Sequence, residues 1–263
     1  MGTLTIRPLC TGIATPPGTT NYYEALRDFY NPAAFMEMPA FTFLVEGGDR
    51  LLLVDTGFPS PAYARQNKLS KAPWPDDVTV IHQLKRAGFE PEDIDDIVIT
   101  HLHWDHCSHM AHFPNARFFV HPKELAFAHD PLPMYYQSYL HPALGLKRPY
   151  DHLKLEPVVE GDEIMPGVTV LETPGHTPGH IALSVDAPSG EYLLVGDAIL
   201  HMDNIKPVPS LHYSVSPPAR NASLIDCCST LEMLRARAKS TDYLLATHDI
   251  GLVARAEKTP VLR

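Results

Sequence analysis

Four side chains that can bind a metal ion fall within six residues of this 263-residue chain. They are His101, His103, Asp105 and His106. Imidazole nitrogens and a carboxylate are the donor set that suits zinc and its first-row neighbours. An apolar run at residues 97–99 stands just before them and indicates a strand. A strand that ends there would deliver all four side chains to one edge of a sheet, so the sequence predicts a metal site at that edge.

Three later strand ends carry residues of the same kind. Strands are predicted at residues 168–172, 192–195 and 243–246, from runs of apolar and β-branched residues. The polar residues that follow them are His176, Asp197 and His248. A single histidine or aspartate at a strand end is most often an ordinary hydrogen-bonded residue. Four such ends in one chain are far less expected by chance, so we expect these residues to complete the site.

The motifs at these strand ends also stand in a particular order. They are His-x-His-x-Asp-His at 101–106, Pro-Gly-His-Thr-Pro-Gly-His at 174–180, Gly-Asp at 196–197 and Thr-His at 247–248. Together with Leu-Val-Asp-Thr-Gly at 53–57, this order resembles the metallo-β-lactamase superfamily. The resemblance covers residues 41–249. It implies an α/β fold, an αββα sandwich of two mixed β-sheets flanked by helices.

The resemblance further implies a dinuclear metal site and a division of the ligands between two ions. The first ion would be held by His101, His103 and His176, the second by Asp105, His106 and His248, and both by a bridging Asp197. Three neutral imidazoles leave a zinc-like ion an open position for water. Two bridged ions can share a hydroxide whose pKa falls towards neutrality. The expected cofactors are two divalent ions, zinc first, although this donor set also accepts iron, manganese or cobalt.

Within the superfamily, the chain most resembles the quorum-quenching N-acyl homoserine lactonases. The Thr-Pro-Gly-His-Thr-Pro-Gly-His block, the length and the aromatic and Met-bearing N-terminal segment carry this similarity. It implies a metal-dependent carboxylic ester hydrolase that opens a lactone ring by attack of the bridging hydroxide, with Asp105 and Asp197 as catalytic carboxylates. Many of these lactonases have a tyrosine three residues after the bridging aspartate. Here Leu200 takes that place, with His201 or Tyr213 as candidate substitutes.

Two other activities stay open as alternatives. One is a glyoxalase II-like thioesterase, which binds its substrate through a basic C-terminal helical extension; this chain ends soon after His248. The other is a mononuclear iron persulfide dioxygenase-like redox member, which metal analysis would reveal. His103 excludes the flavodiiron variant, which has glutamate at that position.

Two segments are expected to shape a substrate pocket within one domain that spans residues 1–263. An N-terminal loop segment covers residues 11–39, and an insertion covers residues 129–155. A loop this long inside a compact domain is more often a lid or a binding element. The candidate substrate-binding residues are Phe35, Met36, Met38, Tyr135, Tyr136, Tyr139 and His201. Asp55 is expected to orient a ligand histidine from behind.

Composition limits the partners. The formal net charge of −10, without any basic block, argues against nucleic acid or an anionic membrane as a partner and leaves a small molecule as the expected substrate. The four cysteines show neither metal-type nor redox spacing, and the N-terminus does not resemble a secretory signal. We expect a cytoplasmic protein that is a monomer or a homodimer.

The remaining elements follow from apolar patterns and turn residues. A hairpin is predicted from strands at 41–45 and 51–54, separated by Gly47-Gly48-Asp49. Further strands are expected at 94–100, 117–120 and 181–185. Helices are expected after an Asp77 N-cap as far as Gly88, at 122–129, and at 218–237, with a short helix at 22–30.

Overall fold

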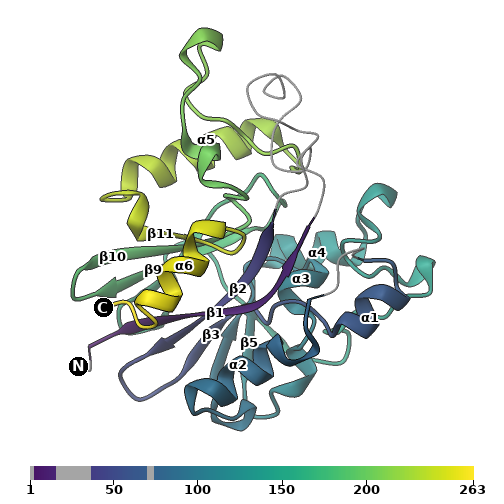
Figure 1. The fold of residues 1–263 in the computed structure, drawn as a ribbon. Coiled ribbons are helices and arrows are strands. Elements are labelled where there is room, and N and C mark those ends of the chain that lie inside the picture. The colour runs from purple at the N-terminus through teal and green to yellow at the C-terminus, as the bar shows by residue number, and fades with distance from the viewer. Residues whose placement is uncertain (1–2, 16–36, 70–73) are drawn as a thin grey trace.

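Two β-sheets pack face to face, and helices cover their outer faces (Figure 1). The structure is a computed structural model, and it describes residues 3–15, 37–69 and 74–263. The predicted αββα sandwich of two mixed sheets is therefore confirmed. The predicted helix at 22–30 lies outside the described residues.

The first sheet has six strands and changes from antiparallel to parallel pairing at its third strand. The strands, in spatial order, are β1 (Thr5–Ala14), β2 (Met38–Glu46), β3 (Leu52–Val54), β4 (Asp96–Val98), β5 (Arg117–Val120) and β6 (Leu155–Pro157). The predicted hairpin is the antiparallel pair of β2 and β3. Because β3 and β4 are parallel, their carboxyl ends lie at the same edge, where Asp55 and His101 follow them.

The second sheet has five strands and is also mixed. In spatial order they are β11 (Leu244–Ala246), β10 (Gly190–Gly196), β9 (Ile181–Ala187), β8 (Val168–Glu172) and β7 (Glu163–Met165). Strands β10 and β11 are parallel, so Asp197 and His248 emerge at one edge. The sequence predicts all of these strands except β7.

Six α-helices complete the described fold. They are α1 (Pro61–Gln66), α2 (Val80–Ala87), α3 (Trp104–Cys107), α4 (Pro122–His129), α5 (Leu224–Arg237) and α6 (Ile250–Lys258). In Figure 1, α2 lies against the first sheet and α5 against the second. No helix among the described residues is long and apolar enough to cross a membrane.

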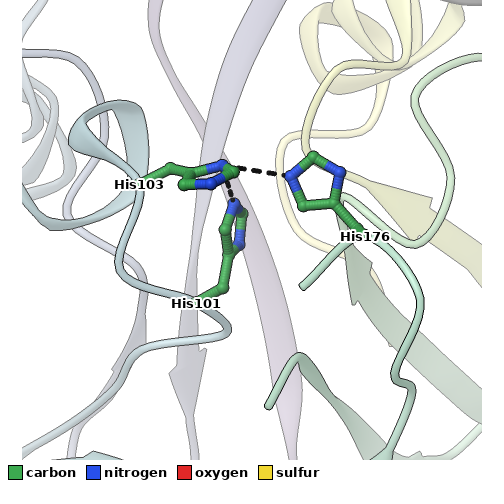
Figure 2. Close-up of side chains that lie close together, drawn as sticks. All are labelled: His101, His103 and His176. Carbon is green, nitrogen blue, oxygen red and sulfur yellow. Dashed lines mark hydrogen bonds between the residues drawn. The ribbon is translucent and has the colours of Figure 1, made fainter. Parts of the chain in front are cut away.

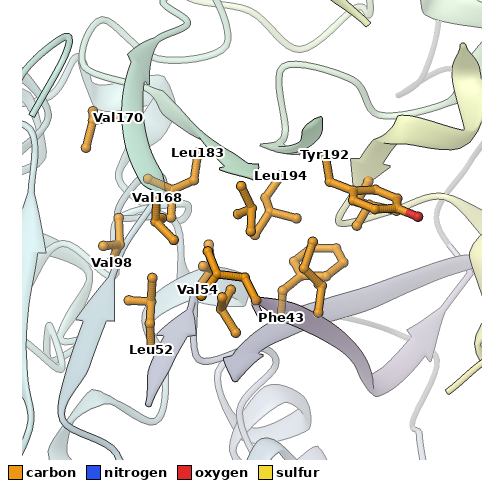
Figure 3. Packing of buried hydrophobic residues seen from close by; sticks show 14 of the residues in the cluster. Phe43, Leu52, Val54, Val98, Val168, Val170, Leu183, Tyr192 and Leu194 are labelled. Atoms are coloured by element: carbon orange, nitrogen blue, oxygen red, sulfur yellow. The ribbon is translucent and has the colours of Figure 1, made fainter. Parts of the chain in front are cut away.

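Alternate side chains of one strand pack into different layers, which explains why the strands are apolar on both faces. Figure 3 shows the inner layer, where Phe43 and Val54 of the first sheet face Leu194 of the second. Their neighbour Leu53 points the other way and packs with Leu84 of α2. On the far side of the second sheet, residues of β8, β9 and β10 pack against α5 in the same manner. The two sheets thus form a rigid frame with the strand ends along one edge.

Several predicted boundaries are wrong for local reasons. The helix α2 is capped by Thr79 rather than Asp77, because residues Asp76–Val78 form a separate 3-10 turn. The helix α5 begins six residues later than predicted, with the hydroxyl of Ser223 accepting a hydrogen bond from the Asp226 amide. The predicted N-terminal loop is also too long. Its first residues belong to β1 and its last to β2, because these two strands pair with each other, from Thr5 with Glu46 to Ala14 with Met38.

Candidate metal centre

Three histidines from two strand ends converge on one point. His101 and His103 follow β4, and His176 follows β8. Nδ1 of His103 lies 3.0 Å from Nε2 of His101 and 3.1 Å from Nε2 of His176. Figure 2 shows the three rings turned towards one another. All three side chains are buried. Three imidazole nitrogens this close, on a rigid frame, form a group that could hold a metal ion.

A second group lies beside the first. Asp105 and His106 stand on α3, and His248 follows β11. Nε2 of His248 lies 3.6 Å from Oδ2 of Asp105. The ligand atoms of these three residues lie within 4.8 Å of one another, so this group could also hold a metal ion.

Asp197 lies between the two groups and turns one oxygen towards each. Its Oδ2 is 3.4 Å from Nε2 of His176, in the first group. Its Oδ1 is 3.1 Å from Nε2 of His106 and 3.2 Å from Nε2 of His248, in the second group. A carboxylate placed in this way can bind one ion with each oxygen.

The outward-facing nitrogens of three histidines are fixed by hydrogen bonds to the surrounding protein. Nδ1 of His176 lies 3.1 Å from the carbonyl oxygen of Arg220, and Nδ1 of His248 lies 2.6 Å from that of Pro39. Nδ1 of His106 lies 2.7 Å from Oδ2 of Asp55. An acceptor at Nδ1 selects the tautomer that carries its lone pair on Nε2. These contacts therefore aim the Nε2 lone pairs at the centre.

Asp55 is itself held firmly at the end of β3. Its carboxylate accepts hydrogen bonds from the backbone amide and the hydroxyl of Thr100, both at 2.8 Å. Its φ of 62° lies in the left-handed region, which aspartate tolerates better than most residues. The structure thus places Asp55 behind a histidine of the cluster, which is His106.

The protonation of the first group and the hydrogen bonding of the cluster fit divalent cations. Burial lowers the pKa of His101, His103 and His176, which keeps these imidazoles neutral and able to donate a lone pair. Nε2 of His106 and Oδ1 of Asp197 are buried and lie 3.1 Å apart, yet they form no hydrogen bond with each other or with another described group. Buried polar atoms without partners are rare and call for an explanation such as an ion. A cation among these atoms would supply the missing interaction.

Glu124 is a functional candidate that the sequence analysis missed. It lies on α4 and is fully buried, although a glutamate in a short helix is expected at the surface. Its Oε1 accepts hydrogen bonds from the amide of Leu102 and the hydroxyl of Tyr139, both at 2.9 Å. Its Oε2 accepts one from the hydroxyl of Thr177, and the amide of Gly179 donates a fourth. One carboxylate therefore joins both histidine loops of the first group to the insertion.

Replacing Glu124 with glutamine is expected to weaken zinc binding by about 10- to 100-fold, the usual effect of losing a group that orients metal ligands. All four partners of this carboxylate are donors, and an amide would turn two donors of its own towards them. Competition with a zinc chelator measures the affinity. Tyr139→Phe is the matched control, because it removes one donor and leaves the carboxylate; its effect should be smaller. Unchanged zinc affinity in Glu124→Gln would refute this role.

A pocket of about 710 Å³ opens above the centre. Its floor includes His103, Asp105, His176, Asp197 and His248. The described residues that form its walls are Ala14, Thr15, Met38, Phe58, Lys68, Leu69, Trp104, Met134, Tyr135, Gln137, Ser138, Leu200, Ala219, Arg220 and Asn221. The walls thus combine apolar side chains with a polar rim, and the insertion contributes four of the residues.

Only some of the predicted substrate-binding residues reach this pocket. Met38 and Tyr135 line it, whereas Phe35 and Met36 lie outside the described residues. Tyr136, Tyr139 and His201 are not among the described residues that line it. Tyr136 stacks on His141, with ring centroids 3.9 Å apart. Tyr139 is buried, and its hydroxyl donates a hydrogen bond to the carboxylate of Glu124.

The position that carries a tyrosine in many lactonases is apolar here. Leu200 lines the pocket. His201, one predicted substitute, accepts a hydrogen bond from the amide of Asp203 and caps a 3-10 turn. Tyr213, the other, is exposed and does not line the pocket. Neither of the two predicted substitutes is among the described residues that line the pocket.

Comparisons with known proteins agree with this architecture. A model of the metallo-β-lactamase superfamily matches residues 36–248. An N-acyl homoserine lactonase from a Bacillus species is 30% identical over 194 residues, which cover 70% of this chain and 73% of that protein. An N-acyl homoserine lactonase from Rhizobium radiobacter is 30% identical over 197 residues, 71% of each chain.

Solved structures show the same fold. A quorum-quenching N-acyl homoserine lactone lactonase is 25% identical and superposes with a TM-score of 0.74, covering 95% of this chain and 94% of its own. The family model spans most of the described strands and all of the motif residues considered above. The chain therefore belongs to the metallo-β-lactamase superfamily, as its motifs predicted.

Proposed function

We propose that this protein is a metal-dependent hydrolase that opens lactone rings, with N-acyl homoserine lactones or closely related lactones and esters as substrates. The observation that carries the proposal is Asp197, whose two oxygens face two separate groups of metal-binding residues. The similarity to proteins named N-acyl homoserine lactonases supports the choice of substrate.

Two divalent ions, zinc first, are the cofactors of this proposal. One would be held by His101, His103 and His176, the other by Asp105, His106 and His248, with Asp197 shared. When bound, such ions polarise a carbonyl oxygen and lower the pKa of water towards neutrality. Among the described residues that line the pocket, Ser138 is the one serine, and none is a cysteine.

The remaining work falls to the protein's own side chains. Asp105 is the more exposed of the two carboxylates on the pocket floor, with 18% of its side chain accessible against 5% for Asp197. It is therefore the group placed to accept a proton from the attacking water and to return it to the ring oxygen when the C–O bond breaks. Asp197 is buried, and its role is to bind both ions and so fix the two groups of ligands relative to each other.

The pocket walls provide the surface for an acyl chain. Phe58 and Trp104 stack with ring centroids 5.5 Å apart, and both line the pocket together with Met38. Apolar walls with a few polar groups are typical of small-molecule sites. We propose that the insertion at 129–155 shapes this pocket, since Met134, Tyr135, Gln137 and Ser138 line it.

A hydrolysis panel tests the proposal. Zinc-loaded protein is assayed with N-acyl homoserine lactones, other aliphatic lactones, thioesters and β-lactams, with product formation followed at constant pH. We expect lactones to be opened and His106→Ala to abolish this. His152→Ala, which removes an exposed histidine away from the pocket, is the matched control. Turnover of thioesters alone, or oxygen-dependent turnover with one iron per chain, would contradict the proposal.

A further inference from the structure

Two positively charged residues line the pocket above the metal centre, and both are exposed. Lys68 stands just beyond α1, and Arg220 stands in the loop before α5. Resting on the proposed lactonase function, we propose that this pocket selects substrates that carry an anionic group, such as a carboxylate, apart from the lactone, and that Arg220 is its main binding partner.

The loop that carries Arg220 is fixed to the metal centre. The carbonyl oxygen of Arg220 lies 3.1 Å from Nδ1 of His176. The amide of Ala222 donates to the carbonyl of Gly175 at 2.7 Å. The side chain of Asn221 donates to the carbonyl of Pro218 at 2.8 Å and closes the turn. The backbone of Arg220 is thus held at a set place relative to a candidate metal ligand, as a specificity residue requires.

The insertion forms hydrogen bonds with the backbone beside each of the two charged residues. The hydroxyl of Tyr135 donates to the carbonyl of Asn221 at 3.2 Å, next to Arg220. The side chain of Gln137 donates to the carbonyl of Lys68 at 2.7 Å. Both of these donors line the pocket as well. The insertion therefore fixes the backbone on each side of the opening.

The charges of the pocket are unbalanced at its rim. The acidic residues among its described lining are Asp105 and Asp197, and both contact histidines of the metal centre. No described acidic side chain is paired with Arg220 or Lys68. Two bound divalent ions would more than neutralise the floor. In a protein with a formal net charge of −10, the described part of this rim is therefore a local positive region, which would attract and orient an anionic ligand.

The chemistry of Arg220 favours a carboxylate. Its guanidinium is planar and presents paired N–H donors that match the two oxygens of a carboxylate. The carbonyl oxygen of Arg220 lies 3.1 Å from Nδ1 of His176, a residue of the first group of ligands. An anionic group bound at Arg220 would therefore lie beside the first group of ligands, within one substrate's length of the lactone.

A pair of substrates separates this inference from the proposed function. N-succinyl-homoserine lactone carries a terminal carboxylate. N-pentanoyl-homoserine lactone is one carbon longer, with a methyl group in the place of one carboxylate oxygen, so it has the same reach without the charge. The zinc-loaded wild type is expected to prefer the succinyl compound in kcat/KM by about tenfold at low ionic strength, since charge-assisted Arg–carboxylate bonds are roughly twice as strong as neutral ones. The preference should shrink at high salt, because salt screens exposed charges.

Variants then test whether Arg220 causes the preference for the succinyl compound. Arg220→Gln is expected to remove most of the preference, Arg220→Lys to retain part of it, and Lys68→Gln to lower it by a smaller factor. Arg65→Gln is the matched control, because Arg65 is an exposed cation on α1 that does not line the pocket, and its removal should leave the preference intact. Circular dichroism and zinc content establish that each variant is folded and loaded.

The outcomes are distinguishable. A wild type that opens both lactones without preference, or a preference unchanged in Arg220→Gln, overturns the inference and leaves the lactonase proposal standing. If neither lactone is opened, the lactonase proposal fails. The inference is then judged by calorimetry with N-succinyl- and N-pentanoyl-homoserine, the ring-opened compounds. Tighter binding of the succinyl compound that is lost in Arg220→Gln supports it, and equal binding refutes it.

Discussion

Asp197→Asn is expected to lower kcat/KM for lactone opening by at least about a thousandfold, or roughly 4 kcal/mol. The same change should reduce the zinc content from two ions per chain to one or none. Asparagine keeps the shape of the side chain but replaces one carboxylate oxygen with an NH₂ group, which cannot bind a cation. Since Oδ1 faces one group of ligands and Oδ2 the other, either orientation of the amide removes a bond to one ion.

Elemental analysis of purified protein and initial rates with a lactone measure both effects. Asp49→Asn provides the control, since Asp49 is an exposed residue in the turn between β2 and β3. An Asp197→Asn protein that retains two ions and activity within tenfold of the wild type would show that Asp197 does not bridge.

Removal of the metal ions is expected to abolish lactone opening and to lower the thermal midpoint by about 10 °C. A ligand present at a thousand times its Kd stabilises the folded state by about 4 kcal/mol, and each kcal/mol shifts the midpoint by about 2–4 °C in a protein of this size. The physical reason is the cluster of buried imidazoles and carboxylates, among them the partnerless Nε2 of His106 and Oδ1 of Asp197.

Differential scanning calorimetry before and after dialysis against a chelator measures the shift, and the added-back zinc should restore both stability and activity. In the Glu124→Gln protein, restoration should need a higher zinc concentration. A chelated protein that opens lactones at the original rate would contradict a role for metal ions in the reaction.

The sequence predicts the frame of this protein well because the frame is made of short-range patterns. Apolar runs such as residues 117–120 coincide with the strand β5, and residues 122–129 coincide with α4. The candidate ligands follow such runs directly. Parallel pairing of β3 with β4 and of β10 with β11 then collects their ends at one edge. Local pattern and sheet topology together therefore suffice to bring distant ligands into one site.

The substrate pocket is less predictable because it is built from loop residues, whose contacts follow no helical or strand periodicity in the sequence. Tyr139 and Tyr135 lie in the same insertion, yet one turns into the core towards Glu124 and the other lines the pocket. Residue type alone does not separate these two tyrosines. Glu124 shows the same limit: its burial depends on four donors from three distant segments, and nothing in the sequence of α4 reveals them.

Titration of zinc into metal-free protein, with the initial rate of N-acyl homoserine lactone opening as the readout, tests the central claim most directly. A dinuclear site that shares Asp197 predicts little activity with one equivalent bound and a maximum at two equivalents. A maximum reached at one equivalent would contradict the dinuclear assignment. Absence of lactone opening at every zinc concentration would contradict the proposed function itself.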